Sequence, residues 1–204
     1  EKNKVQFTKS NIHKFIFFNN LTSENISNYS ILGFVFELSN INTINELQLR
    51  KMFGLKYASL LKDKLFDKAY DNLNYKFKHK NCQEFFAANF ISEFEYEKIK
   101  QIILIPETNK IHPSLYNTVT FLINVLEGEK QLELIEWFVI NQPELLFKAD
   151  KNRIDSYRIK VFQDFFNHHC IEKSYWITTN NQLTVNAPNR QGFIIQFPRS
   201  AAFI

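Results

Sequence analysis

The stretch from Tyr75 to Phe90 constrains the fold more than any other, because its apolar pattern changes period part-way along. Its first half alternates as a half-buried strand does: Tyr75, Phe77 and His79 share one face, and Lys76, Lys78 and Lys80 share the other. From Cys82 the apolar side chains recur at the spacing of an amphipathic helix. The sequence therefore predicts a short strand that runs directly into a helix.

The start of that helix is marked by residues that suit a capped N-terminus. Asn81 is a favourable N-cap, and Glu84 follows three residues later, as in a variant of the capping box. His79 then falls at the junction, near the partly positive end of the helix.

Seven positions across this junction form an ordered phrase, F-x-H-x-x-x-Q-E-(aromatic)-x-A-A. They are Phe77, His79, Gln83, Glu84, Phe85, Ala87 and Ala88. The phrase resembles the one that closes the winged-helix region of NACHT-type STAND NTPases, a group that includes animal inflammasome receptors and bacterial antiphage sensors. In that family the histidine lies near the phosphates of the bound nucleotide and helps to hold the inactive, ADP-bound state. The resemblance implies that His79 is a nucleotide sensor.

The sequence lacks the phosphate loop that such an NTPase needs. No G-x-x-x-x-G-K-[ST] motif occurs, and the four glycines, Gly33, Gly54, Gly128 and Gly192, are too scattered to form one. The chain opens at Glu1, and its one methionine is Met52, so we expect a piece of a longer protein. If the resemblance holds, the ATPase core lies upstream. We therefore expect no enzyme activity and no bound cofactor for this chain alone, with ATP or ADP implied for the parent protein.

Length and composition allow a sizeable core but leave the partner open. The chain has 204 residues, 45% of them hydrophobic, and a net charge of only +4, which is less basic than is usual for a dedicated nucleic-acid binder. No apolar run approaches the ~18 residues of a membrane span, so no membrane partner is expected. Two cysteines, Cys82 and Cys170, suit a reducing compartment, and the cytoplasm is the simplest location.

Residues 1–92 are expected to form a winged-helix-like regulatory module. A helix is predicted over 23–40, with Ser23 as its candidate cap. Further helices are predicted from a cap at Thr43 to Gly54 and over 56–71, before the strand and the capped helix. Residues 11–20 form a short apolar element of ambiguous type. The usual two-stranded wing is poorly marked.

Residues 93–176 are expected to form a HEAT-like array of antiparallel helices. Helices are predicted over 93–105, 113–127 and 131–141, with a short turn of helix from Pro143 and a further helix capped by Asp155. The phrase from Trp137 through Gln142-Pro-Glu-Leu-Leu146, followed by Asp150 and Arg158, is similar to post-NACHT helical segments of bacterial sensors. Residues 177–204 are an irregular or β-hairpin tail, with candidate strands at 182–185 and 192–197.

Each candidate site has a plainer interpretation. His79 contacts a phosphate, or its ring bonds to backbone at the junction. Lys76, Lys78 and Lys80 protect an edge strand from pairing, or they contact phosphate or nucleic acid, Lys78 and Lys80 being the candidate phosphate contacts. Gln83 and Glu84 fit a structural role at the helix start better than a catalytic one.

No metal site is predicted. His168, His169 and Cys170 are consecutive and diverge by ~100° each on a helix, so they cannot converge on one ion. Glu93, Glu95 and Glu97 are likewise splayed apart, which does not favour paired-carboxylate chemistry.

The leading hypothesis is a mostly α-helical regulatory fragment of a STAND NTPase that couples ligand recognition to opening and oligomerisation, in bacteria typically for antiphage defence. Its partners would be the upstream NTPase domain and a protein ligand or further copies of itself. Two alternatives stay open: a free-standing helical scaffold that binds another protein, and a winged helix that binds nucleic acid through the Lys76–Lys80 edge.

Overall fold

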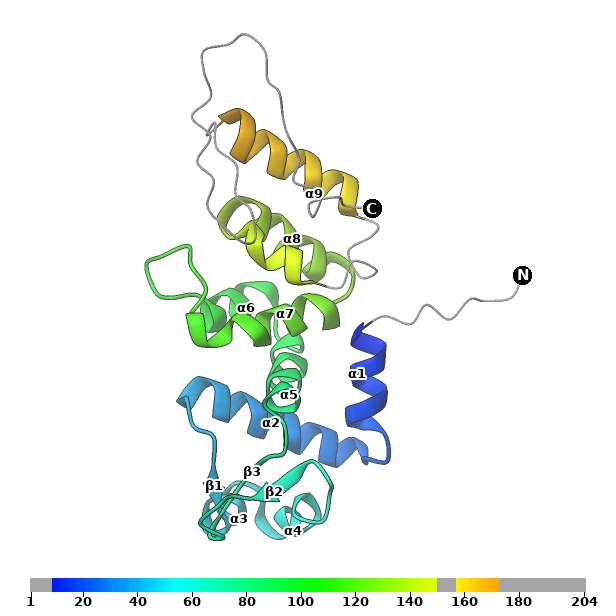
Figure 1. The fold of residues 1–204 in the computed structure, drawn as a ribbon, viewed down its shortest axis with the longest axis vertical. Coiled ribbons are helices and arrows are strands. Elements are labelled where there is room, and N and C mark those ends of the chain that lie inside the picture. Colours follow the sequence, from blue (N-terminus) through cyan, green and yellow to red (C-terminus); the bar gives the residue numbers. More distant parts are fainter. Residues whose placement is uncertain (1–8, 150–156, 173–204) are drawn as a thin grey trace, which may run out of the picture.

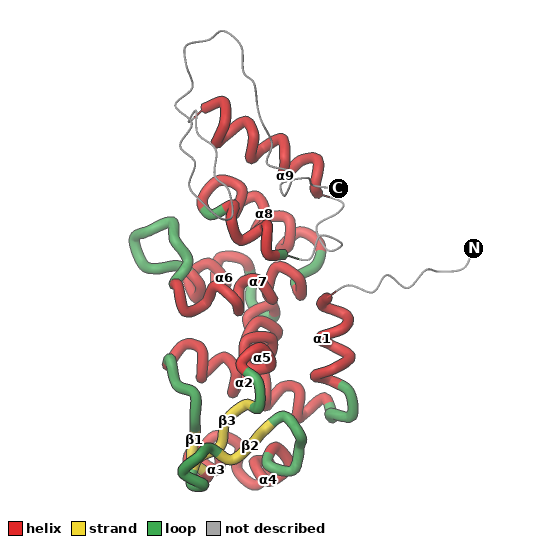
Figure 2. The backbone as a smooth tube through the Cα atoms, viewed as in Figure 1, coloured by secondary structure: helices red, strands yellow, loops and turns green. Residues whose placement is uncertain are grey.

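The computed structural model describes residues 9–149 and 157–172, which form a mostly helical structure with one small sheet (Figure 1). The sheet and the short helices α3 (Glu46–Phe53) and α4 (Tyr57–Leu60) lie at one end of the elongated molecule, and α8 (Gly128–Asn141) and α9 (Arg158–Phe165) lie toward the other (Figure 1). Helix α5 (Lys80–Ser92) runs between them (Figure 2). The mainly α fold with minor β structure expected from the sequence is confirmed for the described residues.

The sheet has three short antiparallel strands, β1 (Ile44–Asn45), β2 (Phe66–Lys68) and β3 (Asn74–Phe77), in the order β1-β3-β2. Ile44 lies opposite Tyr75, and Phe66 lies opposite Phe77. Between β1 and β2 the chain forms α3, the 3₁₀ turn η1 (Gly54–Lys56) and α4. Strand β3 is therefore the central strand of the sheet. The interpretation of its lysines as guards of an exposed edge strand is wrong.

An aromatic core joins the sheet to α2 (Ser23–Ser39) and α5. Phe66 and Phe77 meet edge to face with ring centroids 4.9 Å apart, and the fully buried Tyr29 and Phe86 pack beside them at tilted angles. The Tyr29 hydroxyl donates a 2.7 Å hydrogen bond to the backbone carbonyl of Leu60, so α4 is tied to α2. The ambiguous apolar element near the N-terminus is helix α1 (Lys9–Phe18), whose Phe17 packs on the same core.

The helix predicted over residues 56–71 is wrong beyond Leu60. Helix α4 ends at Leu60, and the chain then forms the β2–β3 hairpin, because Phe66 buries its ring against Phe77 rather than on a continuing helix. The turn is closed by Asp71, whose carboxylate accepts 3.0 Å hydrogen bonds from the backbone N–H groups of Leu73 and Asn74. Asn72 in the left-handed region (φ 57°) completes the reversal.

Two predicted helix starts shift along the chain. Helix α2 is capped by Thr22, whose Oγ1 accepts from the backbone N–H of Asn25, one residue before the predicted cap. Helix α3 is capped by Asn45 rather than Thr43. Asn45 and Gln48 form a complete capping box, with side-chain-to-backbone bonds of 2.8 and 3.0 Å in the two directions.

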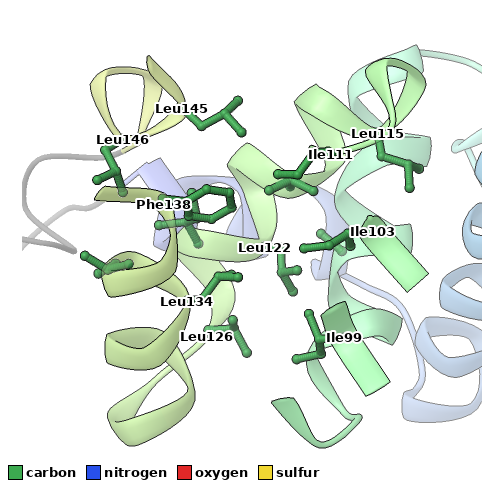
Figure 3. Close-up of a cluster of buried hydrophobic side chains, with 14 of the residues drawn as sticks. Ile99, Ile103, Ile111, Leu115, Leu122, Leu126, Leu134, Phe138, Leu145 and Leu146 are labelled. Carbon is green, nitrogen blue, oxygen red and sulfur yellow. The ribbon is translucent and has the colours of Figure 1, made fainter. Parts of the chain in front are cut away.

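A second apolar core holds the remaining helices (Figure 3). It is formed by α6 (Tyr96–Ile103), η2 (Pro113–Leu115), α7 (Tyr116–Val125), α8, η3 (Pro143–Lys148) and α9, which is followed by the π-helical segment η5 (Phe166–Glu172). Ile99, Leu122 and Phe138 are fully buried in it. Helices predicted over 93–105, 113–127 and 131–141 are thus confirmed with shifted ends. Asp155, the candidate strands at 182–185 and 192–197 and the tail 177–204 lie outside the described residues.

Helices α2 and α5 cross at Gly33 with almost no space between their backbones. A Cβ atom at Gly33 would lie 2.7 Å from the carbonyl oxygen of Gln83 and 2.9 Å from the backbone nitrogen of Ala87. Both contacts are with main-chain atoms, which cannot rotate away. The absence of a side chain at Gly33 therefore sets the distance between the two helices.

Gly33→Ala should lower the free energy of unfolding by about 1–2 kcal/mol, because the forced separation of the helices outweighs the ~1 kcal/mol gained from the better helix propensity of alanine. Urea unfolding followed by circular dichroism measures this change. Ser27→Ala, at an exposed position of the same helix, is the control and should be nearly neutral. A Gly33→Ala protein as stable as the wild type would contradict the close crossing.

Candidate functional site

His79 occupies the junction between β3 and α5, as the sequence predicts. Its backbone is extended (φ −130°, ψ 135°), and its carbonyl oxygen accepts from the N–H groups of Cys82 (3.0 Å) and Gln83 (3.4 Å). His79 is therefore the N-cap of α5, and the prediction that Asn81 caps this helix is wrong, since Asn81 already lies inside it. The His79 side chain makes no capping hydrogen bond and is exposed, so the ring is not sealed in apolar packing.

The first turn of α5 offers hydrogen-bond donors beside this ring. The backbone N–H groups of Lys80 and Asn81 precede the first helical hydrogen bonds and meet no acceptor in the described part of the chain. The helix dipole adds partial positive charge at the same place. An exposed imidazole, free N–H groups and a helix N-terminus together form a surface that can accept an anion.

The two lysines predicted to contact phosphate differ in what holds them. Lys78 is exposed, and its backbone N–H donates a 2.9 Å hydrogen bond to the carbonyl of Leu65. Lys80 directs its ammonium inward to Glu37, with Nζ 2.5 Å from Oε1. Its side chain is half exposed, so only part of its charge is available to an outside ligand.

Glu37 is the centre of a buried polar network that the sequence interpretation missed. It is 3% exposed, and its Oε1 accepts from Lys80 and from the side-chain amide of Gln83, also at 2.5 Å. Its Oε2 accepts from the hydroxyl of Thr118 at 3.3 Å. The network joins α2, α5 and α7. The available signal was a lone carboxylate directly after Phe36 on the apolar face of a helix, a position that needs a partner.

Glu84 is buried in the same region, and its predicted role in a capping box is wrong. It lies in the second turn of α5, 3% exposed, and its Oε1 accepts a 3.2 Å hydrogen bond from the Asn117 side chain on α7. Its Oε2 is buried with no hydrogen-bond partner among the described residues. Burial raises the pKa of this carboxyl, and the nearby Glu37 raises it further, against opposing effects from Asn117 and Lys80.

The rest of the phrase serves packing. Phe85 and Phe86 are fully buried in the aromatic core, and Ala87 lies at the close crossing with Gly33. Cys82 is buried as well, and burial raises the pKa of its thiol to about 12, so it is a poor nucleophile in the folded protein. Of the side chains in the phrase, only His79 is presented to solvent.

The described residues meet neither the requirements of a metal site nor those of a membrane-spanning helix. Within residues 9–149 and 157–172, no three His, Cys, Asp or Glu side chains gather as a metal site requires, and the side chains of His169 and Cys170 are not among those described. Over the same residues, no helix combines the length and apolar character needed to cross a bilayer.

Comparison with protein-family models, with curated proteins and with solved structures gave no match to this chain.

Glu84→Gln should stabilise the protein at pH 7 by about 1 kcal/mol, the scale of one unpaired buried polar atom, because it replaces a buried carboxylate with a neutral group that keeps the bond from Asn117. The folded-state pKa of Glu84 is raised above its ordinary value of 4.5, so ionisation costs stability as pH rises through and above that value. The gain should therefore shrink as the pH falls to 4.5 and below.

Urea unfolding across this pH range measures the effect. The exposed Glu107→Gln is the matched control and should show no such pH-dependent gain. A difference between wild type and Glu84→Gln that does not vary with pH would contradict the burial of an ionisable carboxyl at this position.

Proposed function

We propose that this chain is a regulatory segment of a NACHT-type STAND NTPase. Residues 1–92 would form its winged-helix module, and residues 93–176 would begin a HEAT-like helical region. The chain would hold the nucleotide-bound off state and couple recognition of a ligand to oligomerisation. It would act in the cytoplasm, in antiphage defence. ATP or ADP would be bound mainly by an NTPase domain upstream.

The order of elements in the first part of the chain supports a winged helix. A helix, a short strand, two short helices and a hairpin follow one another as α2, β1, α3, α4 and β2–β3, and the last strand of the hairpin pairs between the other two. In a winged helix this hairpin would be the wing, which the sequence marks poorly. The stacking of α6 to α9 along the long axis supports a repeat-like second part (Figure 1).

The observation that carries the proposal is the presentation of His79. Its ring stands free at the start of α5 beside unfilled backbone N–H groups. A nucleotide phosphate brought by a neighbouring domain would find hydrogen-bond donors there without rearrangement of the core. His79 is thus suited to sense whether the phosphate is present.

Helix α5 supplies a route from that contact to the rest of the molecule. Phe85 and Phe86 belong to the aromatic core, whereas Ala88 and Ile91 belong to the second core. A displacement of the N-terminus of α5 would therefore be felt by both cores. Nucleotide and ligand would each shift the balance between closed and open states according to their differential affinity for the two.

A free-standing scaffold that binds another protein is the second candidate function, and helix α1 favours it. Ile12, Phe15 and Ile16 lie at i, i+3 and i+4 on α1 and are 43%, 72% and 57% exposed. An apolar face of this kind is typical of a helix that packs against a partner.

In the longer protein, His79→Ala should speed ADP release by roughly 10-fold, the scale of one hydrogen bond to a charged group. The measurement is the off-rate of a fluorescent ADP analogue, with co-purified ADP quantified in parallel. The exposed His112→Ala serves as the control and should leave release unchanged. Unchanged release in His79→Ala would overturn the sensor role, and an upstream reading frame without a phosphate loop would overturn the family proposal as well and favour the scaffold.

A further inference from the structure

We propose that the β2–β3 hairpin, residues 66–77, together with the adjoining Lys78, binds single-stranded nucleic acid, with a base stacked on Tyr70 and backbone phosphates on Lys76 and Lys78. This function goes beyond the proposed regulation by nucleotide. It shares Lys78 with the candidate phosphate contacts beside His79, but Tyr70 and Lys76 belong to the hairpin alone, and it does not depend on an NTPase domain.

The tip of the hairpin presents apolar side chains to water. Tyr70 is 99% exposed and Leu73 is 76% exposed, so neither contributes to either core. Lys76 places its ammonium 4.8 Å from the centroid of the Tyr70 ring. This cation–π contact holds the ring beside a positive charge while its surface stays open. An aromatic ring next to a lysine is the arrangement on which a nucleic-acid base stacks while its phosphate is neutralised.

A structural role in the described fold does not explain why lysines occupy positions 76 and 78. Strand β3 is paired on both sides, so Lys76 does not guard a sheet edge, and the Lys78 side chain is exposed. Alternation along an extended strand places Lys76 and Lys78 on the same face, away from the buried Phe77. Lys62, Lys64 and Lys68 add exposed positive charge in the segment that leads into and along β2.

The acidic side chains of the hairpin limit this charge but do not cancel it. Asp67 lies opposite Lys76 in the register and is exposed. Asp71 at the turn is occupied in the fold, because its carboxylate accepts from the backbone of Leu73 and Asn74 and from the Asn74 side chain, and these bonds lower its pKa.

The residue types favour a single strand over a duplex. The hairpin has lysines but no arginine, and arginine makes most of the bidentate contacts that read base edges in a duplex groove. A lysine is a point charge that binds phosphate without regard to sequence. A base can stack on the face of an exposed tyrosine ring only when that base is not already stacked within a duplex. We therefore expect binding with little sequence preference.

The experiment measures fluorescence anisotropy of the full chain with a labelled oligothymidylate of about 15 nucleotides, and with a duplex of the same length, at several salt concentrations between about 20 and 200 mM. Tyr70→Ala should weaken single-strand binding at least about fivefold with little change in salt dependence. The pair Lys76→Gln with Lys78→Gln should reduce the slope of log K against log salt by about 1.4, as expected for two phosphate contacts on a single strand.

Two further variants separate a defined site from general charge. The pair Lys98→Gln with Lys110→Gln, at exposed positions in the second half of the described chain, makes the same charge change and should leave the slope unaltered. Asp67→Asn should tighten binding roughly twofold, which a purely structural role would not predict. Circular dichroism and thermal melting confirm that each variant is folded.

The proposal is overturned by any of four results: no binding at the lowest salt, no effect of Tyr70→Ala, an equal loss of slope in the Lys98 and Lys110 control, or duplex binding as tight as single-strand binding. The last result would indicate contact with the duplex backbone in place of stacking on a free base.

Discussion

The structure depends on the crossing of α2 and α5 over Gly33. Because the two backbones approach until a Cβ at Gly33 would clash with Gln83 and Ala87, this crossing constrains how closely α5 packs on α2. The same contact brings the Gln83 side chain to Glu37, where its amide and the Lys80 ammonium meet one buried carboxylate oxygen. Steric fit and charge pairing thus act together at this crossing, which lies close to the N-terminus of α5 where His79 is presented.

The polar network around Glu37 contributes more to fixing the arrangement of α2, α5 and α7 than to the free energy of unfolding. Burial of Glu37 is costly in itself, and its hydrogen bonds to Lys80, Gln83 and Thr118 offset that cost only when all three helices are in place. Glu84 beside it lacks a partner for Oε2 in the described chain, so this part of the interface is less well satisfied than the apolar cores on either side. The joint between the two cores thus contains a polar network beside apolar contacts such as that of Phe85 with Phe121, and α5 passes through it.

Local signals in the sequence were sufficient to predict those helices and strands whose structure depends on residues close to one another in the chain. The change of period after His79 predicted the passage from strand to helix, and Gly54 ends α3 with a positive φ of 58°, as expected. The same reasoning failed where two patterns compete. Leu60, Leu61, Leu65 and Phe66 fit a helix by spacing, but Phe66 pairs with Phe77 across a hairpin whose turn is set by Asp71 and Asn72. Caps were misplaced by one or two residues, because several residues that can cap a helix lie next to one another and backbone geometry selects among them.

By itself, the sequence determined that the chain is mainly helical, that a strand runs into a helix at His79, and that no phosphate loop is present, because periodicity, breakers and motifs are properties of neighbouring residues. Only the tertiary structure decided that β3 is the central strand, that Glu37 accepts from both Lys80 and Gln83, that Glu84 faces Asn117 instead of capping a helix, and that the Tyr70 ring is exposed beside Lys76. These features involve contacts between residues that are distant in the chain, or the absence of packing against a residue. A local sequence pattern encodes neither of these. The physical reason is that burial and pairing are set by the sum of all contacts in the folded molecule.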